Sequence, residues 1–431
     1  VRVRVSPSAP LKVKNYCTNS RTIQKSKKTA QPNASAVFLF LVKFKLVPKS
    51  KESAVLSSCA RASSKLSLSR RAALFLVGVR DASIICLGHF MQRVEPVPMN
   101  SPKPLRSRVA LLATGGTIAS SGQSRAQLQD YQVDTKIEAM LANVPLINDL
   151  AEFECEQICN VESHQLNDVV LVPLAKRVQA LCDRSDIDAV VITHGTDTLE
   201  ETAYFLHLVI QTEKPIVLVG AMRPATAMSA DGPLNLFHAT AVAIDPQSRA
   251  QGVLVVMNDR IASARHVTKG HANGVEAFVA TEFGYLGLVS GTAVRFQNKL
   301  TTRHTHESEF ARLVNLDALP TVDIIYDHQG AGTHHFSASV QAGAKGIVLA
   351  ATGQGSLSPQ GEAGVKLARD QGLSVVRASR VWQGWVRPSV KDSSYGLVAA
   401  QTLNPAKARV LLRLALSKTE ESGSLQQYFD C

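Results

Sequence analysis

From about residue 105 onward, short runs of apolar residues alternate with longer amphipathic stretches. Each run ends in a turn rich in glycine, threonine or aspartate, as RVALLA does in TGGT. Short apolar runs of this kind are typical of strands buried on both faces, and stretches 199–210 and 234–244 have the pattern of helices. Their alternation predicts an α/β fold with a mainly parallel sheet. The first series of predicted strands comprises Arg108–Ala113, Ala189–Ile192, Ile216–Val219 and Val253–Met257.

A polar segment that ends near a proline, residues 313–321, separates this series from a second one. The last helix of the second series has a clear start, with Asn404 as N-cap and Pro405 at the first helical position. The pattern therefore predicts two doubly wound, mainly parallel-sheet domains, a larger one at 105–312 and a smaller one at 322–431, joined by a linker. The second series comprises strands Val322–Tyr326, Gly346–Ala350 and Leu373–Val376, and helices near 337–342, 361–371 and 406–416.

Basic residues are concentrated in the first 98 residues, which hold 18 Lys and Arg against three acids. The formal net charge of +12 belongs to this part alone, because the remainder has 29 basic and 32 acidic residues. A nucleic-acid-binding face on the folded part is therefore not predicted. We expect residues 1–104 to be a disordered extension or an artefact of an over-called gene start, since Met99 lies just before the first strand. An export leader is the rival interpretation, because Ser69-Arg70-Arg71 resembles a twin-arginine signal.

Seven cysteines are scattered without the spacing of a zinc site or a disulfide framework. We therefore expect reduced thiols and a cytoplasmic protein, or a periplasmic one if the N-terminal segment is an export leader. No apolar run reaches the roughly 18 residues that span a bilayer, so no membrane segment is predicted. The spacings of His304, His306, His334 and His335 fit no usual metal site, and no metal is predicted.

Two clusters of threonine and glycine lie at the ends of predicted strands, where open parallel sheets bind ligands. Thr114–Thr117 (TGGT) follows the first strand, and Thr193–Thr198 (THGTDT) follows the second. Glycine lets the backbone approach a ligand, and a threonine hydroxyl can supply a nucleophile or a hydrogen bond. The first tetrapeptide alone fits a tight turn or a phosphate cradle about as well.

Taken together, ATGGTIA at 113–119 and THGTDT at 193–198 closely resemble the two signature segments of the bacterial L-asparaginase family. The resemblance covers roughly 105–429 and none of the preceding extension. It implies an amidohydrolase that converts L-asparagine to L-aspartate and ammonia through an acyl-threonine intermediate, with no metal or organic cofactor. Further matching segments are ETAYFL at 201–206, 219–224, SADGP at 229–233, 252–259, VTK at 267–269, SRV at 379–381 and 403–411.

The resemblance assigns the nucleophile to Thr117, the second threonine of the first motif. Tyr131, on the segment that follows, is expected to assist it and to close the site. Thr196, Asp197 and Lys269 match a second triad that handles the proton, and the first two are also expected to contact the substrate. A threonine hydroxyl is a poor nucleophile at neutral pH and needs a base within hydrogen-bond reach. Lysine can be that base if burial lowers its pKa from about 10.4 toward neutrality.

The resemblance also implies how an α-amino acid would be held. Asp197 is expected to contact the α-amino group, and Ser163 to bind the α-carboxylate. His164 stands where relatives usually carry another polar residue, so it either contacts the substrate or is inert. Backbone N–H groups at Gly116 and Gly195 are candidates for stabilising the oxyanion, which is worth roughly 3–4 kcal/mol per donor.

A homotetramer with sites shared between subunits is the assembly that the resemblance implies. Gln354, in the loop at 352–356, matches one contact from the neighbouring subunit. The other such contact, a glutamate, is missing from Trp382–Ser394, so the preference between asparagine and glutamine stays open. Secreted relatives often link the region of Cys182 by a disulfide to a position that is Thr212 here, so that bridge cannot form.

Three other functions compete with an asparaginase. A glutaminase-asparaginase of broader amide specificity would use the same residues. A nucleotide-binding or regulatory α/β protein would hold phosphate in the glycine turns, but the lysine, threonine and aspartate would then be unexplained. An amide-hydrolysing subunit of a tRNA-dependent amidotransferase would need a protein partner and a nucleic-acid module.

Overall fold

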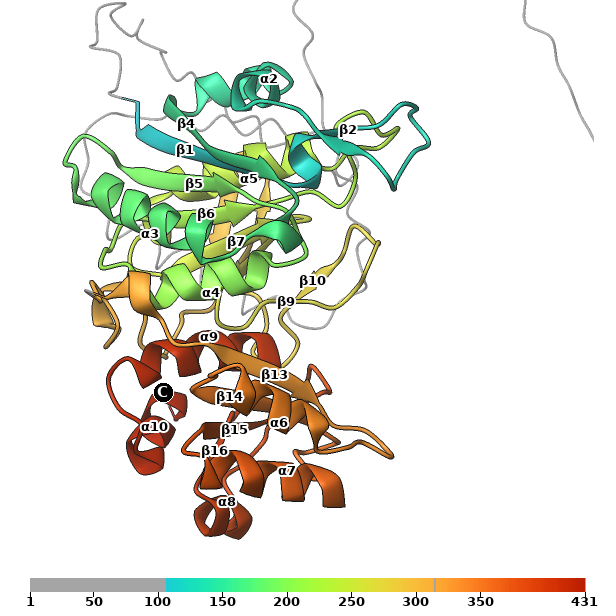
Figure 1. Cartoon of the computed structure of the whole chain (residues 1–431). Coiled ribbons are helices and arrows are strands. Elements are labelled where there is room, and N and C mark those ends of the chain that lie inside the picture. The colour runs from blue at the N-terminus through green and yellow to red at the C-terminus, as the bar shows by residue number, and fades with distance from the viewer. Residues whose placement is uncertain (1–105, 314, 431) are drawn as a thin grey trace, which may run out of the picture. The chain divides into compact units, whose positions relative to one another are not determined.

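The computed structural model describes residues 106–313 and 315–430, which form two main sheets with helices on both faces of each, together with two short two-stranded ones (Figure 1). The larger sheet has the strand order β12-β11-β8-β7-β6-β5-β1-β4, and the smaller has the order β13-β14-β15-β16. The predicted α/β class with mainly parallel sheets is confirmed. The expected extension at 1–104 lies outside the described residues, and the domain boundaries at 312 and 322 stay predictions.

Five neighbouring strands of the larger sheet are parallel, and three at one end are antiparallel. Apart from polar residues at the ends of β1 and β5, the central strands are apolar, since both of their faces are covered. Ala110 and Leu112 belong to one core, whereas Val109 and Leu111 belong to the other. This alternation follows from the period of two along a strand. The parallel strands are β4 (Glu152–Val161), β1 (Arg108–Gly115), β5 (Ala189–Thr193), β6 (Ile216–Val219) and β7 (Val253–Met257), and the antiparallel ones are β8 (Arg260–Ser263), β11 (Gly287–Ser290) and β12 (Ala293–Phe296).

Helices cover both faces of the larger sheet. α3 (Asp168–Asp183) and α4 (Leu199–Val209) bury their apolar residues in one core, and α2 (Ile137–Ala142) and α5 (Gly232–Ile244) bury theirs in the other. The predicted bounds of α4 and α5 are correct to within two residues. α4 carries Glu200 and Glu201 in its first turn, where the helix dipole favours acidic side chains.

The smaller sheet is parallel, and its helix α9 (Pro405–Leu416) lies at the boundary between the two sheets (Figure 1). α9 packs against β13 and β14 and also against α4. Its predicted start is confirmed, because the Lys407 N–H donates to Asn404 Oδ1 at 2.9 Å. One apolar core therefore runs from α4 through α9 into the smaller sheet. The other elements here are β13 (Val322–Tyr326), α6 (His334–Gln341), β14 (Gly346–Ala351), α7 (Pro359–Asp370), β15 (Ser374–Ser379), α8 (Val390–Tyr395), β16 (Leu397–Ala399) and α10 (Ser422–Phe429).

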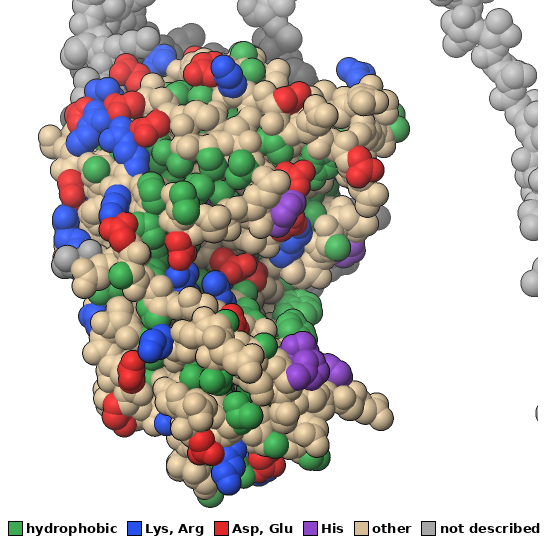
Figure 2. Space-filling view, in the orientation of Figure 1, with side chains coloured by type: hydrophobic (Ala, Val, Ile, Leu, Met, Phe, Trp, Pro, Cys, Tyr) green, Lys and Arg blue, Asp and Glu red, His purple; other side chains and the backbone are tan. Residues whose placement is uncertain are grey.

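Charged side chains of both signs are interspersed on the face that Figure 2 shows. This distribution follows the near balance of acids and bases after residue 98. Among the described helices, none has both the length and the apolar character required to cross a bilayer.

Candidate active site

Two turns meet at the carboxyl edge of the larger sheet because β1 and β5 are neighbouring parallel strands. Gly116, at the end of β1, has a φ of +79°, and a Cβ on it would lie 2.2 Å from the Cα of Gly195. A Cβ on Gly195 would in turn lie 2.8 Å from Ser163 Oγ. Side chains are excluded at both positions, so only glycine allows the two turns to touch. The two threonine-glycine motifs therefore form one site.

Thr117 directly follows this contact, in a single 3-10 turn. Its Oγ1 lies 2.8 Å from the phenol oxygen of Tyr131, which is at hydrogen-bond distance. Tyr131 lies in the hairpin at 120–133, and the hairpin is anchored where the Gly122 N–H donates to Thr226 Oγ1 at 2.8 Å. The phenol is thus placed to exchange a proton with the threonine hydroxyl.

Lys269 lies in β9 (Thr268–Lys269), a two-residue strand paired with β10 (Phe278–Val279). Its Nζ donates to Thr196 Oγ1 at 3.0 Å and to Asp197 Oδ1 at 2.6 Å. The lysine side chain is 17% exposed, whereas that of Asp197 is 59% exposed. The lysine therefore approaches from the buried side, and one aspartate oxygen stays open to the cavity.

Ser163 is fixed between the two motifs. Its Oγ accepts hydrogen bonds from the N–H groups of Asp197 at 3.1 Å and Thr198 at 3.4 Å, and its carbonyl accepts the Thr198 hydroxyl at 2.9 Å. Because the serine oxygen is already an acceptor, its own O–H is free to donate to an anionic group.

These residues line one cavity of about 1050 Å³. Its walls also include Met222, Arg223 and Asn273, to which the sequence patterns assign no role. Arg223 follows β6, and its backbone N–H donates to Asp231 Oδ1 at 3.0 Å. In the sequence this residue lies in the matching segment 219–224, in a turn at the end of a predicted strand, and neither observation assigns it a role.

Two predicted substrate contacts do not line this cavity. His164 is exposed, and its Nδ1 lies 3.3 Å from Glu162 Oε2 and 4.0 Å from Asp197 Oδ2. Gln354 lies in the loop after β14, where its Nε2 donates to the Trp385 carbonyl at 3.2 Å. Within one chain, the structure brings His164 to the edge of the site and leaves Gln354 in the other domain.

Of the two backbone groups predicted for the oxyanion, one is already engaged. The Gly116 N–H donates to the Val161 carbonyl at 2.9 Å, while Gly195 lines the cavity. His194, next to it, is completely buried, and its Nδ1 lies 2.7 Å from the Gly195 carbonyl. A carbonyl only accepts, so Nδ1 carries the hydrogen. Burial lowers the pKa of His194 to about 4, so the ring is neutral near pH 7 and holds the turn.

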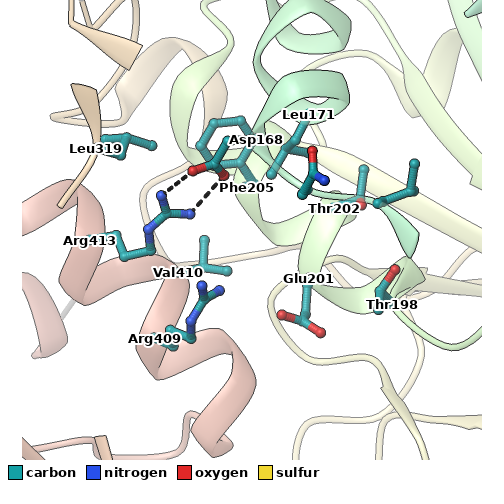
Figure 3. A pocket seen from close by; sticks show the side chains of 12 residues that line it. Asp168, Leu171, Thr198, Glu201, Thr202, Phe205, Leu319, Arg409, Val410 and Arg413 are labelled. Carbon is teal, nitrogen blue, oxygen red and sulfur yellow. Dashed lines mark hydrogen bonds and ion pairs between the residues drawn. The ribbon is translucent and has the colours of Figure 1, made fainter. Parts of the chain in front are cut away.

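A second, smaller pocket of about 230 Å³ lies between α3, α4 and α9 (Figure 3). Arg413 of α9 makes a two-pronged ion pair with Asp168 of α3, at 3.0 and 2.5 Å. Glu201 and Arg409 also line this pocket. Burial raises the pKa of Glu201 and lowers that of Arg409. The pocket lies at the junction of the two sheets and does not include Thr117 or Lys269.

The histidines noted in the sequence assemble no metal site in the described part of the chain, where no group of three or more potential ligands occurs. His304 and His306 contact each other edge to face at 5.7 Å between ring centroids. His334 and His335 pack together at 4.0 Å.

Residues 108–302 match the family model described as Asparaginase, N-terminal, and residues 321–429 match the Glutaminase/Asparaginase C-terminal domain. L-asparaginase 2 of Bacillus subtilis is 45% identical over 340 residues, which cover 79% of this chain and 90% of the relative. Glutaminase-asparaginase of Acinetobacter glutaminasificans is 44% identical over 330 residues, covering 75% and 99% of the two chains.

A solved structure agrees with these matches. The crystal structure of a probable cytoplasmic L-asparaginase from Campylobacter jejuni superposes with a TM-score of 0.73 at 44% sequence identity, covering 75% of this chain and 99% of that one. The match of both family models and the identity over nearly the whole length of several relatives lead to one conclusion: this chain belongs to the asparaginase/glutaminase family.

Proposed function

We propose that this protein is an L-asparaginase, an amidohydrolase that converts L-asparagine to L-aspartate and ammonia. The observation that carries the proposal is a hydrogen-bonded pair of hydroxyl groups, Thr117 with Tyr131, which lines the same cavity as the set Thr196, Asp197 and Lys269. An amide hydrolase that acts through a side-chain hydroxyl needs both a means of activating that hydroxyl and a group that protonates the leaving amine.

The reaction proceeds in two steps. Thr117 Oγ1 attacks the side-chain amide carbon as its proton passes to a neighbouring base, and the C–N bond breaks as the amine takes up a proton and leaves as ammonia. Tyr131 is 2.8 Å from the attacking oxygen, and Lys269 reaches the site through Thr196. Water then attacks the acyl-threonine ester, and the C–O bond to Thr117 breaks as a proton from that water passes to Thr117 Oγ1 and the acid product forms. The Gly195 amide is the candidate donor to the oxyanion.

Recognition of an α-amino acid requires one anionic group and one neutral donor. Asp197 is more exposed than its lysine partner and is placed to accept the α-ammonium group. The Ser163 O–H, whose oxygen already accepts two N–H groups, is assigned to the α-carboxylate. His164 is close enough to Asp197 to influence this contact.

Ammonia release from L-asparagine tests the assignment. The full chain should release ammonia, and Thr117→Ala should reduce kcat by at least about a thousandfold, as losing the nucleophile does in related mechanisms. Thr114→Ala provides a matched control, since Thr114 Oγ1 donates to the Thr193 carbonyl outside the cavity and does not line it. Equal rates for wild type and Thr117→Ala would refute the nucleophile assignment.

A glutaminase-asparaginase is the second candidate, favoured by the cavity of about 1050 Å³, which has room for one more methylene group. One relative also bears that name. Comparing kcat/KM for L-asparagine and L-glutamine decides between the two, because a true asparaginase would discriminate against the longer amide.

We further propose a homotetramer in which Gln354 completes the site of a neighbouring subunit. Gln354 is exposed and does not line the cavity of its own chain, which supports a role at another one. Mixing Thr117→Ala with Gln354→Ala protomers should restore part of the activity. In such mixed tetramers, some sites would have an intact Thr117 from one protomer and an intact Gln354 from its neighbour. Absence of complementation in mixed tetramers would contradict a shared site.

A cytoplasmic location is proposed for the same chain, with the periplasm as the alternative. Cys182 is a buried free cysteine in hydrogen-bond contact with Thr212, which supports a reduced thiol at this position. The relative of known structure from Campylobacter jejuni is described as cytoplasmic. Cell fractionation with an antibody to the chain tests the proposal.

A further inference from the structure

Lys269 is held by more than its two side-chain partners. Its backbone N–H donates at 2.8 Å to Oε2 of Glu200, which lies in the first turn of α4. Glu200 is 9% exposed and therefore nearly out of reach of water. A buried carboxylate needs a partner for each oxygen. The second oxygen, Oε1, accepts the side-chain amide of Asn404 at 2.9 Å.

Asn404 belongs to the other domain, where it caps α9. Its Oδ1 accepts the Lys407 N–H at 2.9 Å, and its Nδ2 donates both to Glu200 and, at 3.0 Å, to Thr268 Oγ1. Every polar atom of the side chain is thus committed, and its amide orientation is fixed, because reversing it would place Nδ2 against the Lys407 N–H. Asn404 links the cap of α9 directly to the strand that carries Lys269.

Lys407 strengthens the same junction. Its ammonium group is almost completely buried and donates to the carbonyls of Arg265, at 3.0 Å, and Val267. The segment 265–269 is therefore held at both ends by the first turn of α9. The strand β9 itself has only two residues and one pairing partner, so it has little rigidity of its own.

We propose that Glu200 and Asn404 are positioning residues that set the place of the Lys269 amine for proton transfer, through a hydrogen-bond relay from the cap of α9 to the backbone of β9. Neither side chain lines the cavity, so the effect is indirect. The inference rests on the proposed function, because it assumes that Lys269 handles a proton during amide hydrolysis. Ser163, which is assigned to the α-carboxylate, is held by separate hydrogen bonds, whereas the Asp197 carboxylate contacts Lys269 itself.

The relay allows a test in which hydrogen-bond polarity is reversed without loss of volume. Glu200→Gln keeps an acceptor for the Lys269 N–H but turns an NH₂ group toward the Asn404 NH₂, placing donor against donor. Asn404→Asp keeps the cap of α9 but places two carboxylates together. The double variant pairs the glutamine NH₂ with the aspartate oxygen, while Thr268 can donate its hydroxyl, so all partners are satisfied again.

We expect each single variant to reduce kcat on the order of tenfold to a hundredfold, with a much smaller change in KM, and the double variant to recover most of the loss. Ser358→Ala, which removes the N-cap of α7 in the same domain, controls for a general loss of stability. Wild-type kcat in both single variants, or a double variant no faster than the slower single one, would overturn the proposal.

Amide hydrogen exchange at Lys269 separates this inference from the proposed function. Exchange there should be faster in each single variant and slow again in the double variant, whether or not the protein hydrolyses asparagine. If the wild type releases no ammonia, the proposed function fails while the exchange pattern still decides the relay. Unchanged exchange in both single variants would eliminate the relay even in an active enzyme.

Discussion

Gly116 is the residue at which backbone geometry and chemistry depend most directly on each other. Its φ is +79°, and any Cβ would lie 2.2 Å from Gly195 Cα, a backbone atom that cannot rotate away. We expect Gly116→Ala to lower the free energy of unfolding by about 3 kcal/mol, from strain and overpacking together. Ammonia release should be lost as well, because the turn that carries Thr117 must shift.

Gly372→Ala is the matched control for this change. Gly372 has a φ of +80° but no atom within 4 Å of the position of a Cβ. Only the backbone penalty applies there, about 1 kcal/mol. Thermal unfolding and ammonia release should therefore distinguish the two variants. Equal losses of stability would mean that the contact with Gly195 has no importance of its own.

The proposed catalytic set could be predicted from the sequence only where its residues lie in recognisable motifs. Thr117 and Thr196 lie in segments that follow buried strands, and adjacent parallel strands bring such segments together. Lys269 is 73 residues from Thr196, and the family resemblance alone connects them. Arg223 could not be found, because its place in the cavity depends on long-range packing that no local pattern records.

At the scale of elements, the ion pair between Asp168 and Arg413 joins α3 to α9 (Figure 3). Arg413 is 9% exposed, so removal of its partner leaves a charge that is poorly hydrated. Because Asp168 is half exposed, we expect Asp168→Asn to lower the free energy of unfolding by only on the order of 1 kcal/mol. Denaturant unfolding measures this change in free energy.

The control for this change is Asp317→Asn, which removes an exposed ion pair with Lys176 and should change stability by much less. Hydrogen bonding to Arg413 also lowers the pKa of Asp168, so the contribution of the pair is present above pH 3.8 and is lost as pH falls through the lowered value. An equal effect of the two variants would mean that the ion pair between Asp168 and Arg413 stabilises the protein no more than an ordinary surface ion pair does.

Two elements could not be predicted from the order of apolar and polar residues, because β4 has no apolar run and α3 contains a proline. β4 is an edge strand in which glutamate, cysteine and glutamine alternate with half-buried residues, so no apolar run marks it. α3 carries Pro173 in its interior, which is atypical of a helix. The central strands could be predicted because they are apolar runs buried on both faces. The helix α9 could be predicted because Asn404 and Pro405 mark its start.

At the scale of the whole molecule, the two sheets share one apolar core. Leu206 of α4, Leu411 of α9 and Val376 of β15 all belong to it and are almost fully buried. We expect the described part of the chain to unfold in a single transition, because α9 cannot leave α4 without exposing this core. Far-UV circular dichroism, tryptophan fluorescence and ammonia release should give coincident midpoints. Trp382 lies next to Gly270, and Trp385 lines a pocket with Arg265 and Phe283, so an earlier fluorescence transition would show that the junction between the two domains opens first.

Acid stability is also a property of the whole core, since several histidines are buried in neutral form. Burial lowers the pKa of His194 to about 4 and that of His266 to about 3, and His207 lies well below its usual 6.5. The unfolded chain binds protons near pH 6.5, so it holds more protons than the native state below that pH. The free energy of unfolding should therefore fall as pH drops from about 6.5 toward 4, by roughly 3 kcal/mol from His194 alone.

His207→Gln isolates one of these contributions. The Val253 N–H donates to His207 Nδ1 at 3.1 Å, so the ring must be unprotonated there, and a glutamine oxygen can accept the same hydrogen bond without titrating. Denaturant midpoints measured from pH 7 down to about 4 should fall less steeply in this variant than in the wild type. His334→Gln, at an exposed position, should leave the slope unchanged. Identical slopes in all three proteins would mean that acid sensitivity arises from the carboxylates, whose paired forms are lost only at lower pH.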